Sequence, residues 1–262
     1  MRKAVFLFFI IQIHLLNSQN ITQNRLPCLE REIPIMLHLL KNGLTDTYDT
    51  DSKILNAIND ANQAFKPICI SFKVIDVVNN PNYNYFFNLS QEANYPDNIE
   101  LFNLYNKIGF INIYTSSISY TNLNGICEDK FNSGITIKVE NRQQDAVSLD
   151  LIKLLARYLG LENTTSVNEL ADGSNGKNAG DSIDDTPADY GKKVSDVLLN
   201  YYKNIPYYVS LKTLDVSGAY TTPMIDNYMA SYFEKLDLYC KRFTYGQYQK
   251  LSENVNKCLV RP

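Results

Sequence analysis

Histidine, on which most zinc hydrolases and many nucleophilic hydrolases depend, is almost absent from this chain. The 262 residues contain two histidines, His14 and His38. A zinc site built from several imidazoles therefore cannot be assembled, and a serine or cysteine nucleophile would have to use His38 as its base or work without histidine. Because His38 lies in a short apolar run, we interpret it as a core residue rather than a catalytic one.

An acidic stretch near residue 180 is the best candidate for binding chemistry. It contains Asp181, Asp184, Asp185 and Thr186. Carboxylate and carbonyl oxygens from a flexible loop are the ligands that hard cations such as Ca²⁺ prefer. The twelve-residue EF-hand pattern is absent. The same composition is also typical of a solvated loop with Asx turns, and the sequence leaves both interpretations open.

The N-terminus has the pattern of a targeting segment. Arg2 and Lys3 precede an apolar run over residues 4–16, and Asn17-Ser18-Gln19 follows. This predicts a signal peptide over 1–18 and an exported protein, either secreted or in the cell envelope. The run is too short for a comfortable membrane-spanning helix, and no second run approaches that length. We therefore expect no integral membrane segment after cleavage.

Charge and cysteine usage narrow the partners and the compartment. The formal net charge is −3, without a cluster of Lys and Arg, which argues against a nucleic-acid partner. No two cysteines form a C-x-x-C pair, so a zinc knuckle is not expected. In an exported chain, two disulfides and one remaining thiol are expected. The sequence does not assign the pairing among Cys28, Cys69, Cys127, Cys240 and Cys258.

Short apolar runs alternate with helical periodicity, which predicts an α+β fold. The predicted strands cover residues 32–40, 68–78, 109–115 and 134–139, with a weaker edge strand at 120–127. The predicted helices cover 51–65 and 146–159, with further helical regions at 194–203 and 235–249. Residues 79–97 are predicted to be a loop, and residues 162–193 a long irregular stretch. An irregular stretch of that length inside a domain usually has a function or is held in place by contacts with another group.

Several short segments, taken in order, carry a resemblance: Ile33-Pro34-Ile35 with His38, residues 110–114, residues 158–161, Gly180-Asp181, residues 185–189, Asn227-Tyr228-Met229 and residues 243–247. Together they resemble the pappalysin-type metzincins, a family of zinc metallopeptidases. The resemblance covers roughly residues 30–250. It implies a metzincin-like α+β fold, with a twisted mixed sheet, a backing helix, an active-site-type helix and an irregular C-terminal lobe. One domain over 19–262 would then have lobes of about 28–161 and 162–262.

The residues that carry zinc chemistry in that family are missing here. The metzincin motif is H-E-x-x-H-x-x-G-x-x-H. Anchoring its glycine on Gly160 puts the histidine positions on Lys153, Arg157 and Asn163 and the general-base position on Leu154. The resemblance therefore implies a degenerate member without a zinc site. Positions 153 and 157 share one helical face, and we expect Met229 to lie beneath them.

The resemblance also gives the acidic loop a specific interpretation. It implies a calcium ion held by the side chains of Asp181 and Thr186 and by the backbone carbonyl of Asp184. Calcium is therefore the one cofactor that we expect, and zinc is not expected.

Three functions from different classes remain. The first is an exported, catalytically inactive metallopeptidase homologue, a pseudoprotease that serves as a protein- or peptide-binding module. The second is an active secreted hydrolase or metallopeptidase with non-standard ligands, for which Glu169 and Asp172 are the acid–base residues we considered. The third is a structural envelope protein. The sequence favours the first.

Overall fold

The structure is a computed structural model. It describes residues 25–40, 48–80, 96–116, 120–121, 133–164, 168–170, 172–189, 213–214, 220–221, 226–230 and 242–259. The predicted signal peptide over 1–18 and the predicted helix at 194–203 lie outside these ranges.

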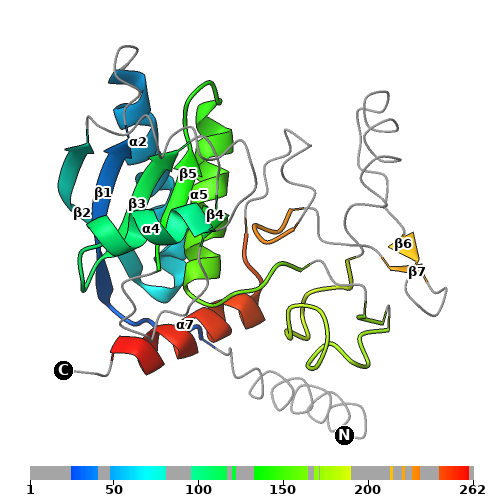
Figure 1. Cartoon of the computed structure of the whole chain (residues 1–262). Helices are drawn as coiled ribbons and strands as arrows, with labels where there is room; N and C mark the ends of the chain where they lie inside the picture. The colour runs from blue at the N-terminus through cyan, green and yellow to red at the C-terminus, as the bar shows by residue number, and fades with distance from the viewer. Residues whose placement is uncertain are drawn as a thin grey trace, which may run out of the picture.

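A five-stranded sheet forms the centre of the N-terminal part (Figure 1). Its strands are β1 (Arg31–Leu40), β2 (Ile70–Asn80), β3 (Ile111–Ser116), β4 (Tyr120–Thr121) and β5 (Ile135–Lys138). They lie in the order β2-β1-β3-β5-β4. The first four are parallel, and β4 runs antiparallel to β5 at the edge. Parallel strands are covered on both faces, which explains why these segments read as continuous apolar runs.

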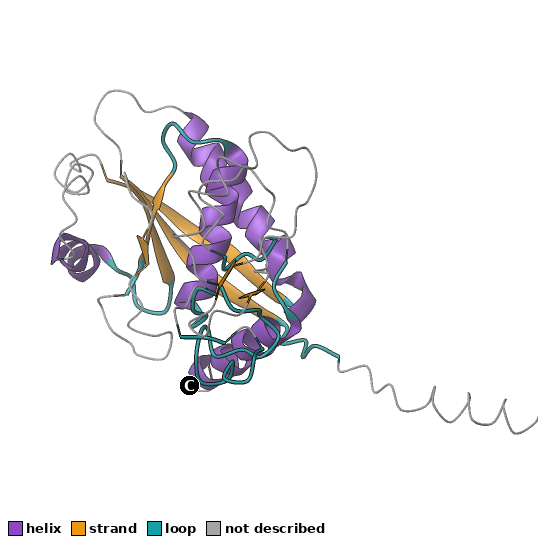
Figure 2. Ribbon diagram, turned by 90° about the vertical axis from the view of Figure 1, so that its right-hand side faces the viewer, coloured by secondary structure: helices purple, strands orange, loops and turns teal. Residues whose placement is uncertain are grey.

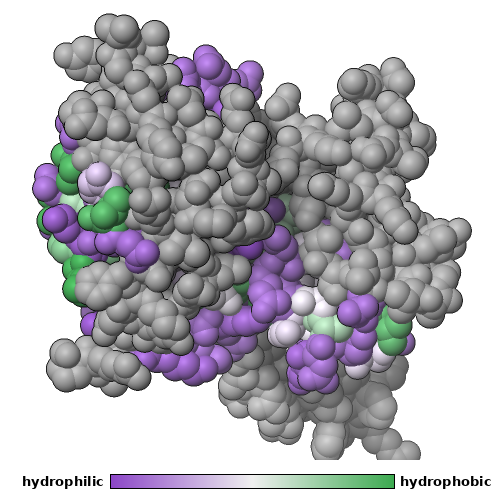
Figure 3. All heavy atoms as spheres, viewed as in Figure 1, coloured by the Kyte–Doolittle hydropathy of each residue, from purple (hydrophilic) through white to green (hydrophobic). Residues whose placement is uncertain are grey.

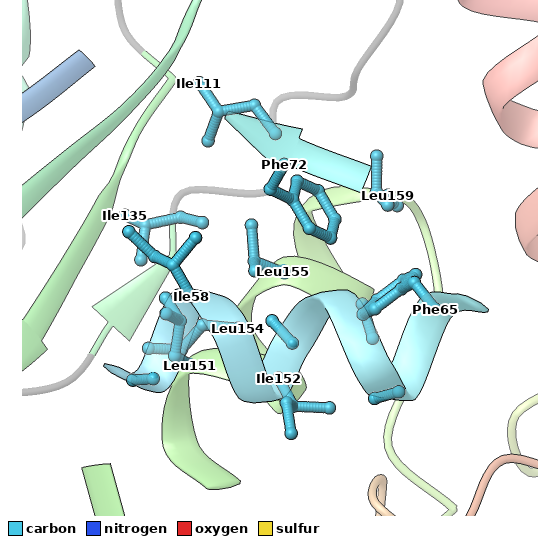
Figure 4. Close-up of a cluster of buried hydrophobic side chains, with 14 of the residues drawn as sticks. Ile58, Phe65, Phe72, Ile111, Ile135, Leu151, Ile152, Leu154, Leu155 and Leu159 are labelled. Atoms are coloured by element: carbon cyan, nitrogen blue, oxygen red, sulfur yellow. The ribbon is translucent and has the colours of Figure 1, made fainter. Parts of the chain in front are cut away.

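Helices cover both faces of this sheet (Figure 2). Helices α2 (Tyr48–Phe65) and α5 (Gln144–Tyr158) pack against one face. Their side chains meet those of the strands in the main core, where Ile58 and Leu155 lie near Ile111 and Ile135 (Figure 4). The burial of this apolar surface is the main force that holds α5 in place.

Helix α4 (Pro96–Tyr105) packs on the other face and was not predicted from the sequence. It is short, and its first residues follow an Asn- and Pro-rich segment that reads as loop. Tertiary packing stabilises it, because Leu101 and Phe102 pack with Leu40 and Tyr114 in a second core cluster. Gly134 permits this contact, since a Cβ there would lie 2.7 Å from the Phe102 ring.

A disulfide joins Cys28 to Cys69 and ties the segment before β1 to the 3-10 turn η1 (Lys66–Ile68). Two backbone hydrogen bonds reinforce the link, from Leu29 N to Ile68 O at 3.0 Å and from Arg31 N to Cys69 O at 3.1 Å. Of the other predicted disulfide partners, Cys127 and Cys240 lie outside the described residues. One of the expected disulfides is thus present.

The closing helix α7 (Tyr245–Leu259) begins later than predicted. The prediction placed it at 235–249, but residues 242–244 are not helical, and residues 235–241 lie outside the described ranges. A capping box sets its start: Thr244 Oγ1 accepts the Gln247 N–H at 3.2 Å, and Gln247 Oε1 accepts the Thr244 N–H at 3.0 Å. Asp185 adds a further cap by accepting the Gly246 N–H at 2.7 Å.

The remaining described elements are short. Strands β6 (Thr213–Leu214) and β7 (Tyr220–Thr221) form an antiparallel pair. None of the helices within the described ranges has the length and apolar character needed to cross a membrane. On the face shown in Figure 3 the described surface is largely hydrophilic, with hydrophobic residues at the left edge, where β2 and α4 lie. Among the described residues, the exposed large hydrophobic side chains include Ile75 and Val77 on β2, Leu104 on α4 and Ile108 just after it.

Candidate functional site

Helix α5 ends at a glycine turn, as the sequence predicts. Gly160 has a left-handed backbone with φ +86°. Its N–H donates to Arg157 O at 2.9 Å, and the Leu161 N–H donates to Ala156 O at 2.9 Å, which is the Schellman pattern. A side chain at Gly160 would also come within 2.5 Å of Asn254 Nδ2 on α7. The glycine therefore serves both the turn and the packing of α7 against it.

The four degenerate motif positions lie on α5 and just after it. Lys153 and Arg157 are half-buried, while Leu154 is buried in the main core. The Lys153 ammonium donates a hydrogen bond to the backbone carbonyl of Ala230 at 3.1 Å. Asn163 is half-buried, and its Oδ1 is a buried acceptor that receives no hydrogen bond from the described part of the chain.

The turn over residues 226–230 lies against α5 and α7. Met229 and Ala230 are fully buried, and the Thr164 N–H donates to Met229 O at 3.3 Å. Asn227 accepts the Met229 N–H at 2.8 Å and donates to Gln247 Oε1 at 2.8 Å. The structure thus places Met229 in a buried turn whose next residue, Ala230, accepts a hydrogen bond from Lys153.

The acidic loop is built around one buried aspartate. Asp181 is 1% exposed, and its Oδ1 accepts hydrogen bonds from Thr186 Oγ1 at 2.7 Å and from the Ile183 N–H at 3.2 Å. Its backbone carbonyl accepts a hydrogen bond from Lys250 Nζ at 2.8 Å. Asp184, in contrast, is exposed and pairs with Lys177 at 3.3 Å. The loop therefore brings Asp181 and Thr186 into direct contact and leaves the Asp184 side chain at the surface.

Sequence reasoning missed that Glu169 belongs to this loop. Its carboxyl is buried beside Gly180, where a Cβ would lie 2.2 Å from Glu169 Oε2. Burial, with the nearby charges of Asp181 and Asp189, raises the pKa of Glu169 to about 7. Burial also raises the pKa of Asp181 to about 6. Gly176 and Gly180, whose added Cβ atoms would lie 3.5 Å and 2.2 Å from the Glu169 carboxyl oxygens, are the sequence signal that the loop packs closely around a side chain.

The two acid–base residues considered from the sequence lie in different environments. Glu169 is buried, whereas Asp172 is exposed and accepts the Ser174 N–H at 2.9 Å within its own turn.

Comparisons with known proteins identify the fold. No protein-family model and no curated protein matches the chain. Among solved structures, a mutant of promirolysin from Tannerella forsythia superposes with a TM-score of 0.54 at 16% identity, covering 87% of this chain and 81% of that chain. Promirolysin is a pappalysin-like metzincin. The fold is metzincin-like. Myroilysin matches with a TM-score of 0.36 at 11% identity, covering 85% of this chain and 79% of that chain.

The residues at the motif positions of this metzincin-like fold do not fit zinc. A protonated lysine has three donors and no lone pair to offer, and the Leu154 side chain is aliphatic. His38, the one histidine among the described residues, is engaged elsewhere, because its Nε2 lies 3.1 Å from Asn112 Oδ1 and its ring stacks on Tyr114. It is 1% exposed, and burial lowers its pKa, so it is a neutral core residue as predicted. Within the described ranges, no three His, Cys, Asp or Glu side chains are grouped as metal ligands.

The acidic loop fits a hard cation in its chemistry. It combines the buried carboxyls of Asp181 and Glu169 with the Thr186 hydroxyl, which are oxygen donors of the kind that Ca²⁺ prefers. Burial first, and then the charges of Asp181 and Asp189, raise the pKa of Glu169, and a divalent cation would offset that repulsion. The loop residues would supply the ligands, and Lys250 already holds the Asp181 backbone in place.

Proposed function

We propose that this chain is an exported, catalytically inactive metallopeptidase homologue that binds a protein or peptide. The contact between Lys153 and the Ala230 carbonyl carries the proposal. This contact means that position 153, where the metzincin motif requires a metal-binding imidazole, carries a hydrogen-bonded ammonium instead. The aliphatic Leu154 beside it cannot accept a proton from water.

Two further observations support export and peptide binding. The Cys28–Cys69 disulfide is of the kind that persists in oxidising compartments, which agrees with the signal-peptide pattern of residues 1–18. Strand β4 pairs with β5 and ends the described sheet. An extended peptide can add to such an edge through main-chain hydrogen bonds.

Binding without turnover is the test of this function. The protein without residues 1–18 should be incubated with an array of extended 12-residue peptides, and the bound peptides then followed by mass spectrometry for a day. We expect some peptides to bind at micromolar concentrations and to remain intact. The control is Thr121→Pro, which removes an N–H from the edge strand and should weaken binding.

The alternatives give different results in the same experiment. Cleavage that persists in the presence of a zinc chelator would favour an active hydrolase with non-standard ligands. Complete absence of peptide binding, with a folded and stable protein, would favour a structural envelope protein.

Calcium should stabilise the fold through the acidic loop. Added calcium at millimolar concentration should raise the melting temperature, because an ion that binds only the folded chain stabilises it by mass action, by about 2.7 kcal/mol at a hundredfold excess over Kd. Asp181→Ala should remove most of this shift. The measurement is a thermal melt with calcium and with magnesium.

Asp172→Ala is the matched control for the calcium experiment. It removes a carboxylate from the same loop, but Asp172 is exposed and bonded within its own turn. This variant should keep the full calcium shift. An unchanged melting temperature of the wild-type protein in calcium would show that the loop does not bind this ion.

A further inference from the structure

The outer edge of β2 is closed at Phe72 by a side chain from α2. Strand β2 ends the described sheet on the side opposite β4, and within that sheet it pairs with β1. The Phe72 N–H donates to Asn62 Oδ1 at 2.6 Å, and the Phe72 carbonyl accepts a hydrogen bond from Asn62 Nδ2 at 3.1 Å. Facing residues of an antiparallel ladder exchange the same two bonds. The Asn62 amide therefore takes the place that a residue of a further strand would take.

Helix α2 holds this amide in position. Asn62 is half-buried, and the neighbouring helix residues Ile58, Ala61 and Phe65 are packed in the main core. The backbone of Phe72 fixes which way the amide points, because an N–H can only donate and a carbonyl can only accept. The contact is therefore a property of the core packing of α2 and not of a loose surface side chain.

A second N–H of β2 is also occupied by a side chain. The Val77 N–H donates to Asp76 Oδ1 at 2.8 Å. A β-bulge lies between the two closed positions, because the register of β1 against β2 skips Ile75 between Val74 and Asp76. Native edge strands use bulges and charged side chains to avoid pairing with another chain.

Without these contacts, the edge would match β2 of a second copy of this chain. Because of the bulge, Lys73 and Asp76 point to the same face of the sheet although they are three residues apart. In an antiparallel pairing about a twofold axis at the bulge, Lys73 of one copy would lie opposite Asp76 of the other, and Phe72 opposite Val77. The side chains of Ile75 and Val77, which are 51% and 39% exposed, would gain apolar neighbours across the strands.

We propose that Asn62 blocks self-association of this chain through β2. It does so by occupying both backbone groups of Phe72 that the twofold pairing would need. The inference goes beyond the proposed function, since it concerns the edge of the sheet opposite β4. It does not depend on whether a peptide binds.

Asn62→Ala tests the block, because alanine favours the helix and removes both hydrogen bonds to Phe72. In sedimentation equilibrium at rising concentration, the variant should approach twice the mass of the wild-type protein, which should stay a monomer. Asn59→Ala is the matched control, since it removes an exposed asparagine about one turn earlier on the same helix. It should also stay a monomer. A monomeric Asn62→Ala variant, or a wild-type protein that associates as strongly as the variant, would overturn the proposal.

Charge reversal shows which surface pairs. Adding Asp76→Lys to Asn62→Ala puts like charges opposite each other and should return the variant to a monomer. Adding Lys73→Asp as well restores opposite charges and should restore the dimer. A dimer of the Asn62→Ala variant that responds to neither change would place the contact elsewhere and contradict the proposal.

A measurement on the wild-type protein covers the case in which Asn62→Ala does not fold. Hydrogen exchange followed by nuclear magnetic resonance reports on the Phe72 amide. It should exchange about as slowly as the amides of β1 inside the sheet, because Asn62 accepts its hydrogen. Rapid exchange at Phe72 would show that Asn62 does not close the edge, and the proposal would fail.

Discussion

Purified wild-type protein should contain far less than one zinc ion per chain, whereas the variant K153H/L154E/R157H/N163H should approach one. The wild-type positions offer an ammonium, a guanidinium, an amide and an aliphatic side chain, none of which matches the neutral imidazoles that zinc requires. The variant restores three imidazoles on the frame of α5 and its Gly160 turn. Elemental analysis after dialysis gives the zinc content directly.

The variant K153H/R157H/N163H, with Leu154 left in place, separates metal binding from catalysis. It should bind zinc without cleaving a protein substrate, because no carboxylate is present to activate water. Circular dichroism with and without zinc shows whether each variant is folded. A wild-type protein that holds stoichiometric zinc, and loses peptidase activity when the zinc is removed, would overturn the proposed function.

Phe65→Ala should lower the free energy of unfolding by about 3–5 kcal/mol, the largest stability effect we expect from a single substitution. Phe65 is fully buried at the end of α2, with its ring 5.1 Å from that of Phe72 and 5.3 Å from that of Phe243. It therefore joins the sheet to the chain just before α7. Truncation leaves a cavity where the two parts of the fold meet. Urea unfolding monitored by circular dichroism gives the free-energy change.

Leu104→Ala is the control for that experiment, because Leu104 is 60% exposed on α4. Its effect should stay within about 0.5 kcal/mol, as for most surface substitutions. A loss at Phe65 as small as that at Leu104 would mean that the contact between α2 and the Phe243 segment does not form in solution.

Local sequence signals predicted the α+β class and most of the elements that carry the candidate site. Apolar runs marked β1, β2, β3 and β5, and the spacing of apolar residues marked α2 and α5. Gly160 marked the end of α5, because a left-handed residue after a helix is most often glycine. The shortage of histidine excluded an imidazole zinc site from composition alone.

Features that depend on distant partners were missed or misplaced. Helix α4 has its apolar contacts on a second face of the sheet, and no local period reveals that face. The start of α7 depends on Asp185, about sixty residues earlier in the chain, as well as on the capping box at Thr244. The prediction that a helical region begins at residue 235 rested on nearby residues only. It could not include a cap that comes from a distant loop.

The sequence by itself determined which side chains stand at the motif positions, and thus that Lys153, Leu154, Arg157 and Asn163 lack zinc chemistry. Only the tertiary structure decided what these side chains do instead. The Lys153 ammonium donates a hydrogen bond to the backbone carbonyl of Ala230. The buried carboxyl that interacts with Asp181 in the acidic loop belongs to Glu169. The physical reason is that residue type sets which bonds a side chain can make, whereas burial and long-range packing set which partner lies within reach.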